Sequence, residues 1–117
     1  MTIVARALVF AAALLVAAGP ASAQDVAKAE IDAFVARVKS CWNLTPEEAE
    51  SGKSVKIRVS LNVDGTLATT EIVDADTSTL GQRLAAGAVR AMQRCAPYSF
   101  SVESYEVWKT IEVDLRT

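Results

Sequence analysis

The chain contains no histidine and only two cysteines among its 117 residues. Histidine is the usual general base near neutral pH and the commonest zinc ligand, so its absence removes both roles. Two cysteines far apart in sequence form neither a Cys-x-x-Cys redox pair nor a convincing metal site. No glycine-rich phosphate loop is present either. We therefore expect no enzyme activity, no metal, no cofactor and no small-molecule substrate. The function is expected to depend on the surfaces of the domain.

Basic residues are also too few for a nucleic-acid-binding protein. The chain has 12 Lys and Arg against 14 Asp and Glu, which gives a net charge of −2. Such proteins usually show a basic stripe, and none is present, so we expect no nucleic-acid partner. Glu47, Glu48 and Glu50 form an acidic cluster. A solvated loop explains this cluster better than a calcium site, because no EF-hand spacing follows it.

The first 23 residues have the layout of a secretory signal. Arg6 is followed by an apolar stretch over residues 7–18, then by Gly19-Pro20 and the small residues at 21–23. The stretch is shorter than the roughly 20 apolar residues needed to span a bilayer. We predict a cleaved signal peptide at residues 1–23 and one periplasmic domain at residues 24–117. The alternative is an uncleaved inner-membrane anchor.

Export would expose both cysteines to oxidising conditions. Cys41 and Cys95 can then form one structural disulfide, which closes a loop of about 55 residues and stabilises the fold by about 4 kcal/mol in the chain-entropy model. The alternative is a pair of buried free thiols.

Two amphipathic helices are predicted. The first runs from Val26, capped by Asp25, to near Asn43, and its apolar residues recur at three-to-four spacing: Ile31, Phe34, Val35, Val38, Cys41 and Trp42. Residues 45–53 are predicted to be a loop. The second helix is capped by Asp76, Thr77 or Ser78 and ends before Ala96-Pro97, with Leu80, Leu84, Ala88, Met92 and Cys95 on one face. Gly87 is suited to a close approach to the sheet.

Three strands are predicted. Residues 55–63 alternate strictly between apolar and polar side chains, which is typical of a strand with one buried face. Asp64-Gly65 is a strong hairpin signal, and residues 66–73 return as a second strand. Residues 99–108 have room for one short helical turn. Residues 109–115 alternate again, with Ile111, Val113 and Leu115 inward.

These elements predict an α+β fold in the order α-β-β-α-β, with both helices packed on one face of a three-stranded antiparallel sheet. Lys56 and Arg58 face outward on the first strand, and Glu112 and Asp114 on the last. Opposite charges favour neighbouring strands, so we predict the strand order 2-1-3.

The last strand is then a free edge. It is either an edge guarded by charge or a docking site for an extended peptide. On the second interpretation, Val113→Pro is expected to remove a donor from the edge. Trp42, Tyr98, Phe100, Tyr105 and Trp108 pack in the core, or form a recognition surface, mainly through Tyr105 and Trp108.

Four segments together resemble the C-terminal domain of the TolA/TonB family of periplasmic energy transducers, most closely the TolA-like domains of alphaproteobacteria. The likeness covers about residues 31–115. Its segments are Cys41-Trp42-Asn43, Asp64-Gly65-Thr66-Leu67, residues 91–98 (AMQRCAPY) and residues 105–109 (YEVWK).

The resemblance implies a helix-flanked three-stranded antiparallel sheet that binds partners by strand addition. In that family the partners include the β-propeller TolB, phage coat proteins, colicins and outer-membrane receptors. By this resemblance Cys41 and Cys95 match a common cysteine pair, and the partner-binding edge comprises Tyr105, Trp108, Lys109, Thr110, Ile111, Glu112 and Val113.

The expected function is therefore to bind an extended segment of a periplasmic or outer-membrane envelope protein, linked to envelope integrity or energy-coupled transport. Family members carry a membrane anchor and a long spacer, whereas here the domain follows the signal directly, so we expect binding rather than energy transduction. The alternative is a membrane-tethered accessory subunit of a Tol/Ton-type transport system.

Overall fold

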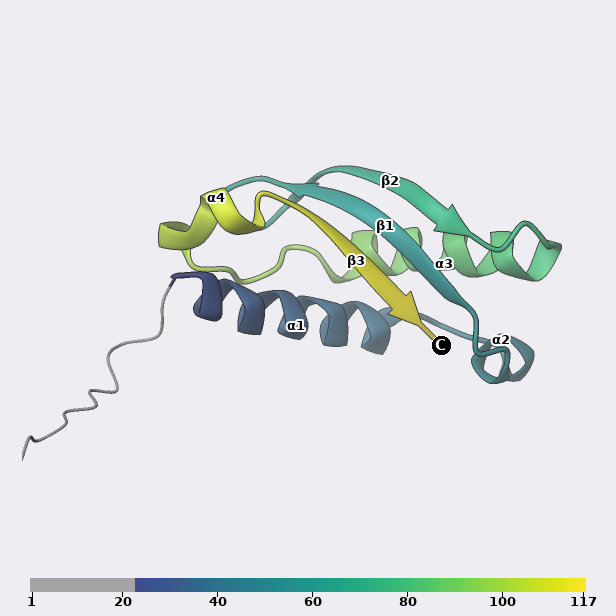
Figure 1. Cartoon of the computed structure of the whole chain (residues 1–117). Coiled ribbons are helices and arrows are strands. Elements are labelled where there is room, and N and C mark those ends of the chain that lie inside the picture. The colour runs from purple at the N-terminus through teal and green to yellow at the C-terminus, as the bar shows by residue number, and fades with distance from the viewer. Residues whose placement is uncertain (1–22) are drawn as a thin grey trace, which may run out of the picture.

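The computed structural model describes residues 23–117 (Figure 1). The signal peptide predicted for residues 1–23 lies outside the described residues, apart from Ala23, where the first helix begins. No helix within residues 23–117 combines the length and apolar character needed to cross a membrane. The elements follow in the order α1 (Ala23–Cys41), α2 (Pro46–Glu50), β1 (Ser54–Leu61), β2 (Leu67–Ala75), α3 (Thr79–Cys95), the 3-10 turn η1 (Val102–Ser104), α4 (Tyr105–Trp108) and β3 (Thr110–Arg116).

The three strands form one antiparallel sheet in the order β2-β1-β3, with α1 and α3 on one of its faces (Figure 1). The α+β class, the element order α-β-β-α-β and the strand order 2-1-3 are confirmed. Of the three short helical segments, η1 and α4 lie within residues 99–108, where one short helical turn was predicted, and α2 is an addition to that outline. One ion pair agrees with the charge argument for the strand order, because the Arg58 guanidinium of β1 lies 2.7 Å from the Glu112 carboxylate of β3.

The core lies between the sheet and the two long helices. Val55, Ile57, Val59 and Leu61 of β1 alternate with polar residues, so all four point to the helices and are buried. The helices meet them with buried side chains at helical spacing, which are Ala27, Phe34 and Val38 from α1 and Leu84, Ala88 and Met92 from α3.

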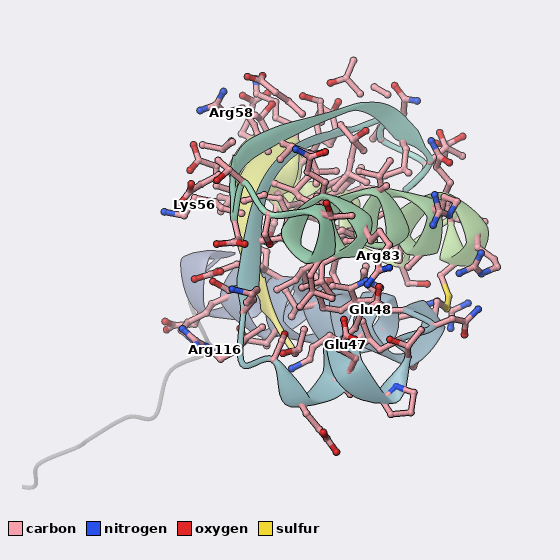
Figure 2. All side chains as sticks on the ribbon, turned by 90° about the vertical axis from the view of Figure 1, so that its right-hand side faces the viewer. Glu47, Glu48, Lys56, Arg58, Arg83 and Arg116 are labelled. Atoms are coloured by element: carbon pink, nitrogen blue, oxygen red, sulfur yellow. A yellow bond between two sulfur atoms is a disulfide. The ribbon has the colours of Figure 1, made fainter. Side chains whose placement is uncertain are left out.

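Residues 45–53 do not form the predicted loop, because α2 occupies Pro46–Glu50. The Thr45 side chain accepts a hydrogen bond from the Glu48 N–H at 3.1 Å, and the Glu48 carboxylate accepts one from the Thr45 N–H at 2.9 Å. This capping box, with proline in the first turn, favours a helix start. Glu48 is buried, and Figure 2 shows it with Glu47 beside Arg83 of α3, so α2 is tied to the second long helix.

The hairpin begins earlier than predicted. β1 ends at Leu61, and Val63 is 51% exposed instead of continuing the buried row. The N–H of Asn62 donates to the Thr66 carbonyl and that of Gly65 to the Asn62 carbonyl, so the chain reverses here. Gly65 has a φ of +86°, which glycine adopts without strain.

Both long helices differ from prediction at particular residues. Asp25 lies in the first turn of α1 instead of capping it, and α1 ends at Cys41, two residues before Asn43. The start of α3 agrees with prediction, because Ser78, one of the three predicted caps, is its N-cap, with its hydroxyl accepting from the Gly81 N–H at 3.0 Å. Gly87 approaches the indole of Trp42 and not the sheet, because a Cβ there would lie 3.3 Å from the indole nitrogen.

The C-terminal ends of α1 and α3 meet at the Cys41–Cys95 disulfide, whose Cα atoms are 6.4 Å apart. Two arginines cross between the helices at this point. Arg94 donates to the Cys41 carbonyl at 2.8 Å, and Arg37 donates to the Cys95 carbonyl at 3.3 Å. Helix C-termini carry partial negative charge, so these cations offset the repulsion between the two ends.

Candidate functional site

The outer edge of β3 is the candidate site. β3 pairs with β1 over seven consecutive residues without a register shift, from Ser54 opposite Arg116 to Ser60 opposite Thr110. No strand within residues 23–117 pairs with its other side. The edge is thus a straight row of backbone groups next to the long helix α1 (Figure 1).

Hydrogen bonds at the two ends of the ladder show which groups face outward. The Leu61 N–H donates to the Lys109 carbonyl, and the Thr117 N–H donates to the Lys53 carbonyl. Successive residues of a strand point their backbone groups to opposite sides. Residues 111, 113 and 115 therefore face β1, and residues 110, 112, 114 and 116 turn their N–H and carbonyl groups to the free edge.

This alternation corrects one expectation. The N–H of Val113 faces β1, and the Val113 side chain is only 4% exposed. Proline at Val113 would therefore break the internal ladder instead of modifying the edge. On either side of Val113, Glu112 and Asp114 point their N–H groups outward.

The other edge of the sheet is irregular. β2 has register shifts opposite Lys56/Ile57 and Ser60/Leu61, which leave extra residues in β2. Such bulges disrupt the even spacing of backbone groups and bend the strand. The same sheet thus has one regular edge, at β3, and one bulged edge, at β2.

Charged side chains run across the outward face of the sheet in two rows. Arg58 of β1 lies opposite Glu71 of β2 and Glu112 of β3, with ion pairs of 3.3 Å and 2.7 Å. Lys56 likewise lies opposite two acidic residues, Asp74 and Asp114, but forms an ion pair with neither among residues 23–117. The hydrogen bond and charge of Glu112, then the charge of Glu71, raise the pKa of Arg58. Figure 2 shows Lys56 and Arg58 pointing away from the helices.

The predicted site residues separate into exposed and buried groups. Thr110, Glu112 and Lys109 are exposed, and Lys109 pairs with Glu106 at 2.6 Å. The side chains of Ile111 and Val113 point from β3 into the core and are buried, and Trp108 is fully buried. The Trp108 indole N–H donates to the Ser101 carbonyl at 2.8 Å, and its ring stacks on Phe100 with centroids 4.4 Å apart. Trp108 therefore has no exposed surface with which to contact a partner.

Tyr105 has a local role that sequence reasoning did not identify. The Lys109 N–H donates to the Tyr105 carbonyl within the last turn of α4, so it is not available to β1. The Tyr105 hydroxyl instead donates to the Leu61 carbonyl at 2.9 Å. Tyr105 thereby completes the ladder where β3 begins and sets the position of the edge.

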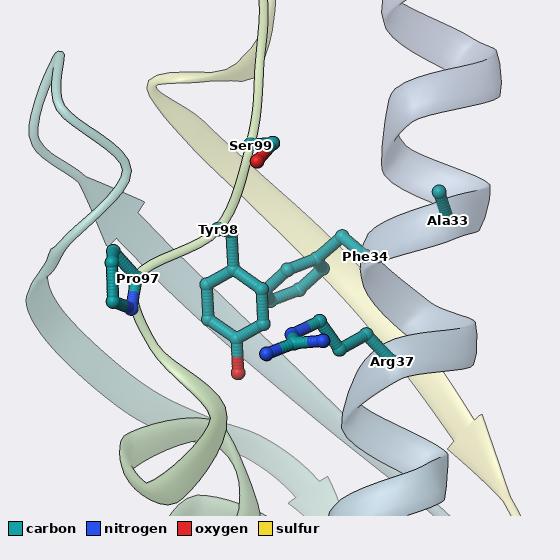
Figure 3. Close-up of a pocket in the computed structure, with 6 residues that line it drawn as sticks. All are labelled: Ala33, Phe34, Arg37, Pro97, Tyr98 and Ser99. Carbon is teal, nitrogen blue, oxygen red and sulfur yellow. The ribbon is translucent and has the colours of Figure 1, made fainter.

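A pocket of about 280 Å³ lies on another side of α1, lined by Ala33, Phe34, Arg37, Pro97, Tyr98 and Ser99 (Figure 3). Its polar groups serve the fold. Arg37 donates to the Cys95 carbonyl, and the Tyr98 hydroxyl donates to the Met92 carbonyl at 2.7 Å. Burial, opposed by the charge of Arg37, raises the pKa of Tyr98 to about 12. The pocket is thus explained by helix packing.

Residues 24–105 match a protein family described as "Uncharacterised conserved protein UCP034077". The chain belongs to this family. The matched residues run through α1, the β1–β2 hairpin and α3 to the first residue of α4. A search of curated protein sequences found no match.

Among solved structures, the fold is similar to the solution NMR structure of TolAIII bound to a peptide derived from the N-terminus of TolB. The TM-score is 0.65 at 16% identity, and the alignment covers 86% of this chain and 81% of TolAIII. The sequence resemblance to TolA-type domains is therefore matched by a TolAIII-like fold.

Proposed function

We propose that the chain is a periplasmic protein-interaction domain of the TolA/TonB C-terminal type. It binds an extended segment of an envelope protein by adding that segment to β3 as a fourth strand. The regular free edge of β3 carries this proposal, because its outward backbone groups at residues 110, 112, 114 and 116 can pair with a visiting strand. The domain acts by binding and not by catalysis.

Two further observations support the proposal. The fold resembles TolAIII, which was solved with a TolB peptide bound. The Cys41–Cys95 disulfide suits an oxidising compartment, in agreement with the predicted export signal. Binding of this kind would link the domain to envelope integrity or energy-coupled transport.

Asp114→Pro tests the edge directly. Proline removes an outward N–H and is tolerated on edge strands, so partner binding is expected to fall at least tenfold while the domain stays folded. Asp114→Ala is the matched control, since it removes the same carboxylate but keeps the N–H. Thr70→Pro is the control on β2, where the register turns the Thr70 N–H away from β1.

Partner binding is measured by placing a photo-crosslinking residue at Thr110 and, separately, at Thr70 in the exported protein. Mass spectrometry then identifies the crosslinked segments. Extended envelope-protein segments are expected from Thr110, kept with Thr70→Pro, lost with Asp114→Pro and reduced far less by Asp114→Ala, which removes a charge but no backbone donor. Crosslinks that persist in Asp114→Pro, or that arise equally from Thr70, would refute binding at β3.

A further inference from the structure

Each of the two rows of charged residues on the outward face of the sheet ends with an acidic residue on β3. Across the sheet one row runs Glu71, Arg58, Glu112, and the next runs Asp74, Lys56, Asp114. Each row therefore alternates negative, positive, negative from β2 to β3. Cross-strand neighbours of opposite charge stabilise a sheet, and like charges destabilise it. A fourth strand at β3 continues both rows favourably only if it is basic at those two places.

We infer that the segment bound by β3 carries two basic residues two positions apart, opposite Glu112 and Asp114. This inference rests on the proposed function and specifies the partner's chemistry. Since side chains on one face of a strand recur every second residue, both cations fall on the outward face together. The ion pairs formed among residues 23–117 do not include Asp114, so this carboxylate has a place for a new cation.

The third row extends the pattern with hydroxyl groups. Ser60 lies opposite Thr69 of β2 and Thr110 of β3, and its hydroxyl is 3.4 Å from that of Thr110. A serine or threonine in the incoming strand would continue this row, because paired hydroxyls also favour neighbouring strands. The preferred segment thus has a hydroxyl residue two positions from the nearer basic one.

The inward side chains of the segment are expected to be apolar. On a helix of 3.6 residues per turn, Ile31 and Val35 lie on the flank of α1 away from Arg37, which reaches toward α3. Both are partly buried against the core. Because α1 contacts β3, a strand added beyond β3 would pass over this apolar flank. The full pattern is an alternation of apolar residues with basic and hydroxyl residues.

Three basic residues on or beside β3 and α1 already have partners within the fold, and the centre of the β3 edge is acidic. Lys109 pairs with Glu106, Lys28 pairs with Asp32, and Arg116 donates to the Gly52 carbonyl at 3.2 Å. A second copy of the chain is a poorer occupant, since two β3 edges both bring acidic centres to the interface. Charge complementarity therefore favours a basic segment of another protein.

The peptide Thr-Val-Lys-Val-Lys-Val-Thr, blocked at both ends, tests the inference. It is the same in both directions, so it fits a parallel or an antiparallel strand. Thr-Val-Glu-Val-Glu-Val-Thr is its matched control. Affinities for the whole protein are measured by fluorescence anisotropy of labelled peptides. We expect about tenfold tighter binding of the lysine peptide, with the preference weakened at high salt.

Two charge reversals locate the preference. Asp114→Lys is expected to reduce or invert it, whereas Asp74→Lys is expected to preserve it. Both variants place a lysine opposite Lys56, so they perturb the sheet equally. Thermal unfolding checks that each remains folded. An unchanged preference in Asp114→Lys would overturn the inference.

The remaining outcomes distinguish the inference from the function on which it rests. Equal binding of both peptides, lost in Asp114→Pro, would overturn the charge preference and leave strand addition standing. Lysine-peptide binding that survives Asp114→Pro would place it elsewhere and overturn the inference. Failure of the lysine peptide to bind would also overturn the inference. A dimer of the chain that forms in analytical ultracentrifugation and is dissociated by Asp114→Pro would overturn it too, because β3 would then bind a second copy.

Discussion

The N–H of Tyr98 donates a 2.9 Å hydrogen bond to the carbonyl of Gly65. This bond fastens the tip of the β1–β2 hairpin to the segment that follows α3, more than thirty residues away. The same contact leaves no room for a side chain at Gly65, because a Cβ there would overlap the Tyr98 carbonyl oxygen. The hairpin tip is therefore part of the packed structure.

Gly65→Ala is expected to lower the free energy of unfolding by about 3 kcal/mol, because it adds steric overlap to the cost of a positive φ. Urea unfolding measures this loss. Gly52→Ala is the control, since Gly52 also has a positive φ, of +68°, but no atoms lie within 4 Å of the place that a Cβ would occupy there. Its cost should be about 1–2 kcal/mol. Equal losses in the two variants would show that the Tyr98 contact is unimportant.

Removing the disulfide is expected to destabilise the domain without changing its fold. The bridge spans 54 residues, which corresponds to about 4 kcal/mol in the chain-entropy model. Unfolding of the wild type in denaturant, with and without a reducing agent, measures the effect. The double variant Cys41→Ala, Cys95→Ala should match the reduced wild type and should not respond to the reducing agent. A wild type whose stability is unaffected by reduction would contradict this expectation.

Stability should fall at high pH through Tyr98. Burial keeps this phenol neutral in the folded chain up to a pKa of about 12, whereas the exposed phenol of the unfolded chain ionises near 10. The unfolded state loses its proton first as the pH rises, so the stabilisation is complete below pH 10 and is lost between pH 10 and 12. The slope from this group is at most about 1.4 kcal/mol per pH unit.

Tyr98→Phe isolates that contribution. Its unfolding free energy, measured by denaturant titration at several pH values, should decline less steeply than that of the wild type in this range. If the unfolding free energies of the two proteins fall in parallel with pH, folding does not raise the pKa of Tyr98.

Trp108→Phe should affect stability and not partner affinity. Phenylalanine can keep the stacking on Phe100 but loses the indole N–H bond to Ser101, which costs about 1–3 kcal/mol. Because Trp108 is fully buried, binding of the lysine peptide to the folded variant should be unchanged. A large loss of peptide affinity at unchanged stability would show instead that Trp108 takes part in binding.

The strand order could be predicted from the charges on the outward faces of the strands. Lys56 and Arg58 required acidic neighbours, and Glu112 and Asp114 supply them from β3. Strict alternation over β1 and β3 also identified the buried rows of both strands. These features are local or pairwise, so they can be recognised without coordinates.

Other features could not be obtained in this way. The direction of the Val113 N–H depends on the register of the ladder, which alternation of side chains does not specify. The bulges of β2 depend on how its residues pair with β1, and no spacing in the sequence marks them. The helix α2 is different, because Thr45 and Glu48 are a capping-box signal that was available in the sequence.

The contrast between a regular β3 and a bulged β2 limits how far the sheet can grow. Fibres need two edges that accept a neighbour, so that each copy can pass the pairing on to the next. Here an added strand at β3 uses the one edge suited to accept it. Association through this sheet should consequently stop after a single step, giving a finite complex instead of a polymer.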